Sequence, residues 1–384
     1  MTDDLPPNPA LLPAGLRDLL PPDAEAEAAC VAALMGAFAA HGYRRVKPPL
    51  LEFEDSLLAG SGAAVAEQTF RMMDPHTQRM MGLRADMTPQ VARIATTRMA
   101  AVARPLRLSY AGQCIHVRGA GLAADRQVAQ AGLELIGADS VAADAEMLLV
   151  GVDALAAIGL TEVSFDLTLP TFAAMLLDDA AITGERRAQL IHALDRKDAV
   201  AVARHGGTLA GTLTDLLLAS GRAEPALAAL AAASLPPPAR ALADRLAAVV
   251  AALRARRPDL RLTIDPVEFR GFRYHTGVSV TVYAPGRAEE LGRGGRYVCG
   301  EAEPATGLTL FPDALLRAAS APAPAARLYL PFAASPSEDS LAALRAAGWA
   351  TVAGLEPEAD PLAEARRLDC THILRDGTPA ALPE

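Results

Sequence analysis

The chain has 384 residues, a formal net charge of -9, 51% hydrophobic residues and 21% charged residues. This length accommodates two or three domains, and the composition is that of a soluble globular protein. The negative charge argues against general nucleic-acid binding, which requires a basic surface. No apolar run reaches the roughly 18 to 20 residues of a membrane span, and the N-terminus lacks the pattern of a signal peptide. We therefore expect a cytoplasmic protein that does not contact membranes.

Cysteine and histidine spacing gives no indication of a metal site. The four cysteines are far apart, with no CxxC pair, and the seven histidines show no HxH or HxxxH spacing. The cysteines are typical of free thiols in a reducing compartment. We expect no metal and no cofactor.

The first 169 residues alternate between helical and extended patterns. A helix is expected from Asp23 to His41, with Asp23 as its cap, and a second from Thr88 to Val102, with Thr88 as its cap. Strands are expected at 43–46, 107–117, 128–136 and 165–167. This order favours an α+β fold built on an antiparallel sheet, with flanking helices.

The rest of the chain divides into a helical segment, a return to strands, and a small terminal region. Residues 170–257 are apolar at helical spacing, and strands follow at 260–264, 278–283 and 306–310. An Ala/Pro run at 321–325 resembles a stiff linker. We predict a core domain from 1–169 and 258–320, a helical insertion from 170–257, and a small α/β domain from 326–384.

Six segments, in the correct order over about 300 residues, resemble motifs of histidyl-tRNA synthetases. Any one of them is weak alone, but their shared order makes coincidence improbable. They are Pro13–Pro21, Gly42–Glu52 with the first-motif proline at Pro49, Leu83–Thr88, Arg126–Glu134, Phe269–Gly277 and Gly294–Tyr297.

Two positions depart from the chemistry that the resemblance implies. Synthetases of this class hold the ATP phosphates with one arginine in an FRxE motif and another in a GLER motif. Here the collinear positions hold His116, followed by Arg118 at the acidic position, and Ala314. A mostly neutral imidazole and a methyl group cannot make the bidentate contact that arginine makes to phosphate. We therefore interpret His116, Arg118 and Ala314 as degenerate adenylation positions, and expect no enzyme activity of this kind.

The amino-acid side of the site is better retained. Gln130 and Glu134 have the same parity on a predicted strand, so both can face one cavity. The resemblance implies that these side chains and others bind histidine, with Arg270 pairing its carboxylate. The histidine-binding candidates are Asp86, Thr88, Gln130, Glu134, Arg270, Tyr274 and His275. His275 stands where the family has tyrosine, and Arg273 where it has aspartate.

Simpler interpretations remain for several of these residues. Arg270 and Glu134 also suit a structural ion pair without function. Gln130 alone is more often a polar strand residue than a ligand, and His116 is better explained as a packed or solvated residue than as a catalytic base. The Gly-rich stretch 292–296 resembles a phosphate-binding nest but lacks the context of a P-loop, so a turn is favoured there.

A synthetase-like chain without adenylation residues resembles the regulatory subunits of ATP phosphoribosyltransferase. That family implies a short-form catalytic subunit as partner, self-association as a dimer through the first motif, L-histidine as feedback effector, and no tRNA. The alternatives are a working histidyl-tRNA synthetase and another synthetase paralogue; both require the arginines that this chain lacks.

Overall fold

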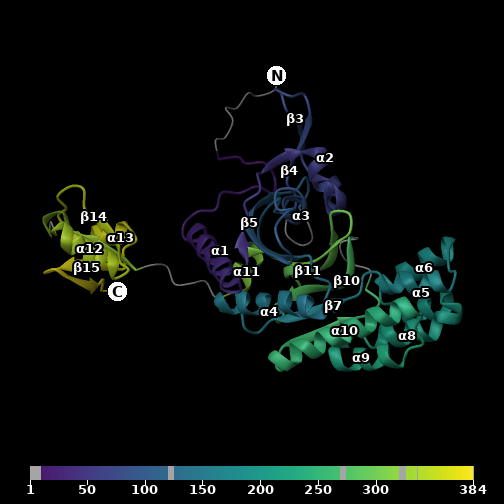
Figure 1. The fold of residues 1–384 in the computed structure, drawn as a ribbon. Coiled ribbons are helices and arrows are strands. Elements are labelled where there is room, and N and C mark those ends of the chain that lie inside the picture. The colour runs from purple at the N-terminus through teal and green to yellow at the C-terminus, as the bar shows by residue number, and fades with distance from the viewer. Residues whose placement is uncertain (1–9, 120–124, 269–273, 320–325, 335, 384) are drawn as a thin grey trace, which may run out of the picture. The chain divides into compact units, whose positions relative to one another are not determined.

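The computed structural model describes residues 10–119, 125–268, 274–319, 326–334 and 336–383. The chain forms two compact units, Met1–Ser320 and Ala321–Glu384, which are described separately. Figure 1 shows the elements of both units.

A nine-stranded sheet forms the centre of the first unit. The strand order is β1-β5-β6-β12-β11-β10-β7-β9-β8, and neighbours are antiparallel except for β1/β5 and β7/β9. The strands are β1 (Arg44–Arg45), β5 (Leu106–Ile115), β6 (Gln127–Ile136), β7 (Ser164–Thr168), β8 (Gly221–Arg222), β9 (Arg261–Asp265), β10 (His275–Tyr283), β11 (Glu290–Cys299) and β12 (Glu303–Leu310). The predicted α+β class with a mainly antiparallel sheet is confirmed.

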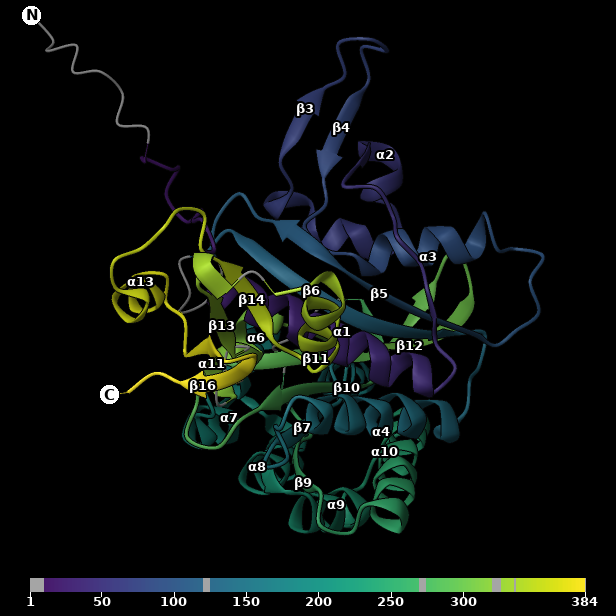
Figure 2. The ribbon, with the colours of Figure 1, turned by 90° about the vertical axis from the view of Figure 1, so that its left-hand side faces the viewer.

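Helices cover both faces of this sheet (Figure 2). On one face, α1 (Asp23–Ala40), α4 (Val141–Ala157) and α11 (Pro312–Ala318) pack on strand residues such as Leu133 and Leu308. On the other face, α3 (Thr88–Thr96) packs on Leu108, Tyr110 and Ile136. Side chains alternate between the faces of a strand, so Leu133 and Leu135 face α1 and α4 while Glu134 faces the α3 side.

A small three-stranded sheet projects beyond α3. Its order is β2-β4-β3, with β2 (Leu51–Phe53), β3 (Arg71–Met73) and β4 (Met80–Leu83); α2 (Glu54–Leu57) and a 3-10 helix, η1 (Gly60–Gln68), connect β2 to β3. Figure 2 shows the β3–β4 hairpin extending outward. Met72, Met73 and Met80 on this hairpin are 41%, 62% and 43% exposed, and Leu50 beside it is 49% exposed. Met73 and Met80 are cross-strand partners, so their exposed side chains lie on one face of the hairpin, and Met72 lies on the other.

Residues 170–257 are mainly helical. The elements are α5 (Phe172–Asp179), α6 (Gly184–Asp195), α7 (Ala199–His205), η2 (Gly207–Leu209), α8 (Ala210–Leu218), α9 (Ala223–Ala232) and α10 (Pro237–Arg256). This segment shares one hydrophobic core with α4 and the sheet, and Arg245 of α10 pairs with Asp144 of α4 at 2.8 Å. None of the helices in the described ranges is long and apolar enough to span a membrane.

The second unit has its own four-stranded sheet, ordered β14-β13-β15-β16. Its elements are β13 (Arg327–Leu330), η3 (Phe332–Ala334), α12 (Glu338–Ala346), β14 (Ala350–Ala353), α13 (Pro361–Arg367), β15 (His372–Arg375) and β16 (Thr378–Ala381). Tyr329 is buried on one face of this sheet and Leu328 on the other.

Three local predictions are wrong. Asp23 is the first helical residue of α1, and the cap position is Pro22, which offers no side-chain bond. Thr88 begins α3 instead of capping it, because its hydroxyl is used by Glu134, and the helix ends at Thr96. The Gly-rich stretch 292–296 is the middle of strand β11 and not a turn.

Candidate functional site

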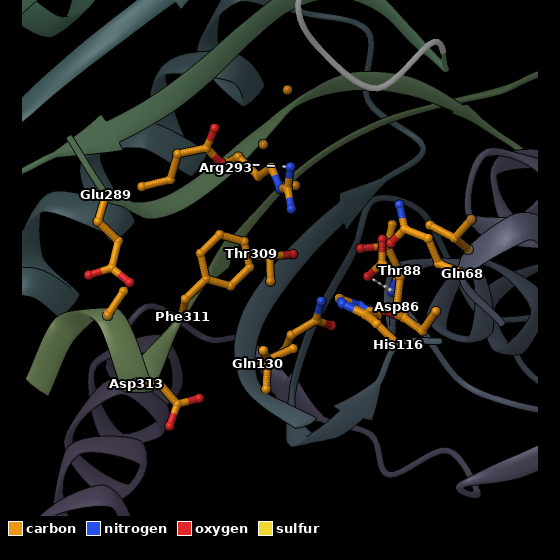
Figure 3. Close-up of a pocket in the computed structure, with 18 of the residues that line it drawn as sticks. Gln68, Asp86, Thr88, His116, Gln130, Glu289, Arg293, Thr309, Phe311 and Asp313 are labelled. Atoms are coloured by element: carbon orange, nitrogen blue, oxygen red, sulfur yellow. Dashed lines mark hydrogen bonds and ion pairs between the residues drawn. The ribbon is translucent and has the colours of Figure 1, made fainter. Parts of the chain in front are cut away.

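A cavity of about 370 Å³ lies on the α3 side of the large sheet. Of the residues singled out from the sequence, it is lined by Asp86, Thr88, His116, Gln130, Glu134, Tyr274, His275 and Ala314. In Figure 3, Asp86, Thr88 and His116 lie on one side of the cavity, and Glu289, Phe311 and Asp313 lie on the other, with Gln130 and Thr309 between them. Strand parity correctly predicts that Gln130 and Glu134 face one cavity.

The turn before α3 places Asp86 and Thr88 at the buried end of this cavity. Arg84 anchors the turn by donating from Nε to the Gln113 carbonyl at 2.8 Å and from Nη1 to the Pro48 carbonyl at 3.1 Å. The Thr88 amide donates to Asp86 Oδ1 at 3.2 Å. The Met87 amide donates to the Gln130 side-chain oxygen at 3.1 Å, so Gln130 ties strand β6 to the turn.

Glu134 lies at the centre of a set of hydroxyl groups. Its Oε1 accepts from the hydroxyls of Thr88, at 3.0 Å, and Tyr110, at 3.3 Å, and its Oε2 accepts from Tyr297 at 2.9 Å. Gly307 is opposite Glu134 on β12, where a Cβ would be 1.9 Å from Glu134 Oε2. A glycine is therefore required at position 307 for the carboxyl group to occupy this position.

Burial dominates the protonation of this end of the cavity. Glu134 is 1% exposed, and desolvation raises its pKa from 4.5 to about 8, against the three hydroxyl bonds, which favour the charged form. Desolvation also raises the pKa of Asp86, although the Thr88 amide bond lowers it. Desolvation lowers the pKa of His275 to about 4, so its imidazole is neutral at pH 7.

The open end of the cavity carries charges that are already paired. Arg317 donates to both carboxylate oxygens of Glu289, at 2.5 and 3.1 Å. Arg293 is 3.6 Å from Glu290, and its guanidinium group lies over the Phe311 ring, 5.2 Å from the centroid. The acidic side chains of this end outnumber its basic ones: Asp125, Glu289, Glu290 and Asp313 against Arg293 and Arg317.

The degenerate adenylation positions differ in their placement. His116 is 8% exposed, and its Nε2 is 2.8 Å from the Ala85 carbonyl, so this nitrogen is the donor and the ring supports the turn that holds Asp86. Ala314 is 3% exposed, lines the cavity and contributes no charge. Arg118 is exposed and is not among the lining residues.

Two predicted residues are not placed at the cavity. Arg270 lies outside the described residues, as does Arg273. Pro49 is exposed, and its carbonyl accepts a hydrogen bond from Gln90 Nε2 at 2.8 Å.

Sequence reasoning missed several residues of the site. Arg293 and Tyr297 lie two pleats apart on β11, and both line the cavity. The alternation of Arg293, Gly295 and Tyr297 is the signal that could have found them, had the stretch been assigned to a strand. Tyr110 and Thr309 join the same network through a 2.7 Å hydroxyl–hydroxyl bond.

Comparison with known proteins agrees with this architecture. A family model described as histidyl-tRNA synthetase matches residues 15–315. A relative from Gluconobacter oxydans, described as an ATP phosphoribosyltransferase regulatory subunit, is 55% identical over 371 residues, which cover 97% of each chain. Another so described, from Paramagnetospirillum magneticum, is 56% identical over 367 residues, 96% of each chain.

Solved structures share the fold. A Bacillus halodurans protein, described as an ATP phosphoribosyltransferase regulatory subunit/histidyl-tRNA synthetase, has a TM-score of 0.78 at 24% identity, over 93% of this chain and 96% of that one. A histidyl-tRNA synthetase from a Nostoc species has a TM-score of 0.77 at 17% identity, over 95% of this chain and 91% of that one. With a synthetase-type sheet, a family match over most of its length and full-length relatives above 50% identity, the chain belongs to the ATP phosphoribosyltransferase regulatory subunits, a histidyl-tRNA synthetase-like family.

Proposed function

We propose that this chain is a non-catalytic subunit that a short-form catalytic ATP phosphoribosyltransferase subunit requires for the first step of histidine biosynthesis, and that free L-histidine inhibits the complex through it. One observation carries the proposal: among the described residues, the cavity has two buried carboxyl groups that form no ion pair, and neither adenylation position holds a cation for phosphate. Such a cavity suits an amino acid and does not suit ATP.

The buried end matches the polar groups of histidine. Asp86 and Glu134 suit its ammonium group and the N–H of its imidazole, while Gln130, Thr88 and the hydroxyl of Tyr274 offer further hydrogen bonds. His275 adds a neutral ring beside Tyr274, with the two ring centroids 4.5 Å apart. Arg270 is proposed to pair with the ligand carboxylate, by resemblance alone, because it lies outside the described residues.

The adenylation chemistry is proposed to be lost at both of its arginine positions. The Nε2 atom of His116 is committed to the Ala85 carbonyl, and Ala314 has no polar side-chain atom. The arginine nearest to Ala314 along the chain, Arg317, is held by Glu289 in a two-bond ion pair. The excess of acidic side chains at the open end would also repel a triphosphate.

We propose a two-fold dimer formed around the first motif. Pro49 is exposed there, and the exposed side chains of Leu50, Met73 and Met80 give the adjoining segments an apolar surface, with Met72 on the opposite face of the hairpin. An isologous contact would bury this surface against its copy. A separate surface must then bind the catalytic subunit.

We expect no tRNA binding, no membrane association and a cytoplasmic location. The domain limits 1–169 with 258–320, 170–257 and 326–384 remain our interpretation.

Co-expression with a short-form catalytic subunit tests the regulatory role. We expect one heteromeric peak on size exclusion and a higher phosphoribosyltransferase activity than that of the catalytic subunit alone. Two separate peaks with unchanged activity would contradict the proposal.

Histidine inhibition curves of the reconstituted complex test the site. Removing one member of a buried charged pair costs about 2 to 5 kcal/mol, so Arg270→Ala should raise the inhibitory histidine concentration by roughly 30-fold to several thousand-fold. Arg261→Ala, at a side chain that is 57% exposed, is the control and should leave the curve unchanged. Superimposed curves for Arg270→Ala and the wild type would mean that histidine is sensed elsewhere.

The second candidate function is a working histidyl-tRNA synthetase. The synthetase-type architecture of the buried end favours it, and the residues at both adenylation positions argue against it.

A further inference from the structure

Asp86 and Glu134 form a coupled pair at the buried end of the cavity. Thr88 bridges them, since its amide donates to Asp86 Oδ1 at 3.2 Å and its hydroxyl donates to Glu134 Oε1 at 3.0 Å. The two side chains are 8% and 1% exposed. Neither carboxylate forms an ion pair with any residue in the described part of the chain, and all the side-chain partners of Glu134 there are hydroxyl groups.

Two buried carboxylates without a cation cannot both be charged at low cost. A proton shared within the pair removes one of the two charges, and the Thr88 bridge keeps the groups close enough to affect each other. The charge of Asp86 raises the pKa of Glu134, and burial raises the pKa of both carboxyl groups. A bound cation would replace that proton as the compensating charge.

We propose that Asp86 and Glu134 select a ligand that brings a positively charged ammonium group into the buried end, and that binding of this ligand releases one proton from the pair. The inference rests on the proposed function, because histidine is the ligand considered. On ligand binding, the neutral carboxyl group loses its proton to solvent, and the resulting carboxylate pairs with the ammonium group. Ligand affinity is therefore linked to pH.

The other titratable and charged groups near the pair come from several elements. Burial raises the pKa of the neighbouring tyrosines and cysteines, and lowers that of His275 to about 4. The charge of Arg293 on β11 opposes the effect of burial on the pKa of Asp86. The groups concerned are Tyr43, Tyr110, Cys114, His116, Tyr274, His275, Arg293, Tyr297 and Cys299.

Calorimetry in buffers of different ionisation enthalpy measures the proton directly. At pH 7 we expect wild-type chain in its complex to release about one proton per histidine bound, because Glu134, with its pKa of about 8, is mostly neutral in the empty cavity. Affinity should weaken by about tenfold per pH unit from pH 8 to pH 6.5. Glu134→Gln should release almost no proton, and the exposed control Arg261→Ala should release as much as the wild type.

Ligand analogues separate charge from shape. Imidazolepropionate, which lacks the amino group, should bind at least tenfold more weakly than histidine and release no proton, whereas thiazolylalanine, which keeps the amino group but has a ring that stays neutral, should still release one. Equal proton release by wild type and Glu134→Gln would overturn the proposal.

Infrared spectroscopy of the ligand-free chain makes the two proposals distinguishable. Between pH 6 and pH 9 the wild type should lose a protonated-carboxyl band that is absent from Glu134→Gln. If this band is present but histidine does not bind, histidine is not the effector. The proposed proton release would then apply to another ligand that carries an ammonium group. If the band is absent, the protonated pair does not exist and this inference fails, whatever histidine does.

Discussion

The two ends of the cavity differ in whether their charged side chains have ion-pair partners. At the buried end, Asp86 and Glu134 are surrounded by hydroxyl and amide donors, and no described cation pairs with them. At the open end, Arg317 is held by Glu289 in a two-bond ion pair and Arg293 lies near Glu290. A carboxyl group with no cationic partner in the protein can lose its proton and pair with a cationic ligand, whereas a charge already paired cannot bind one without breaking the pair. The binding capacity of this cavity therefore lies at its buried end.

Adenylation provides the largest expected effect. Loss of one preorganised charge costs about 10² to 10³ in rate, so loss of two should lower histidine-dependent pyrophosphate exchange by roughly 10⁴-fold or more relative to a synthetase. The measurement is exchange of labelled pyrophosphate into ATP with the purified chain, beside a histidyl-tRNA synthetase as positive control. Exchange at synthetase-like rates would show that the open end does hold ATP, and would remove the contrast between the two ends.

Stability should depend on pH through Glu134. Its pKa is about 8 when folded and near 4.5 when exposed, so between these values the folded state holds a proton that the unfolded state has released. The free energy of unfolding therefore falls as pH rises from about 4.5 to 8 and is level above that range. The total change is on the order of 4 kcal/mol.

Urea unfolding of the wild type and Glu134→Gln, at intervals from pH 5 to pH 8.5, measures this dependence. The amide cannot ionise, so the difference in unfolding free energy between the two chains should shift in favour of Glu134→Gln as pH rises. A difference that stays constant with pH would show that Glu134 is already ionised in the folded chain, and the buried end would then resemble the open one.

The elements that sequence predicts well are those with a local signal. Alternation along β6 places Gln130 and Glu134 on one face, and the structure has both at the cavity. The sequence does not predict strand β11, because glycines weaken a strand on propensity grounds. Close packing requires them there: a Cβ on Gly294 would be 2.1 Å from the Gly307 carbonyl oxygen. Such a contact between separate strands leaves no trace in local pattern.

The partners of Glu134 could not be read from sequence for a similar reason. Thr88, Tyr110 and Tyr297 come from three elements, and only the sheet order brings their hydroxyls to one carboxyl group. A threonine before a proline is typical of a helix cap, and tertiary contact with Glu134 outweighs that preference at Thr88. The same limit applies to His116, whose contact with Ala85 joins segments 31 residues apart.

Gly307→Ala tests how tightly the residues around Glu134 are packed at the buried end of the cavity. The added Cβ would be 1.9 Å from Glu134 Oε2, so the carboxyl group must move and its bond with Tyr297 must break. We expect a loss of about 1 to 3 kcal/mol in unfolding free energy, as for other overpacked cores, together with loss of histidine binding. Thermal unfolding and calorimetry provide the two measurements.

Gly36→Ala is the matched control for this substitution. Gly36 lies in α1, and a Cβ there would meet nothing within 4 Å, so the change should stabilise the chain slightly, by up to about 1 kcal/mol. If Gly307→Ala were equally harmless, the cavity would have more room around Glu134 than the structure gives it.

Glu289→Gln should have the smallest effect of these changes. It weakens the two-bond pair with Arg317, but both side chains are 31% to 40% exposed, and ion pairs in contact with solvent contribute only about 0 to 1 kcal/mol. The variant frees Arg317 for an incoming anion without touching Asp86 or Glu134. We therefore expect histidine affinity and proton release to stay within about twofold of the wild type, while affinity for inorganic pyrophosphate, measured by calorimetry, rises modestly. A tenfold loss of histidine affinity would show that part of the ligand binds at the open end, beside Glu289. Ligand binding would then not be confined to the buried end.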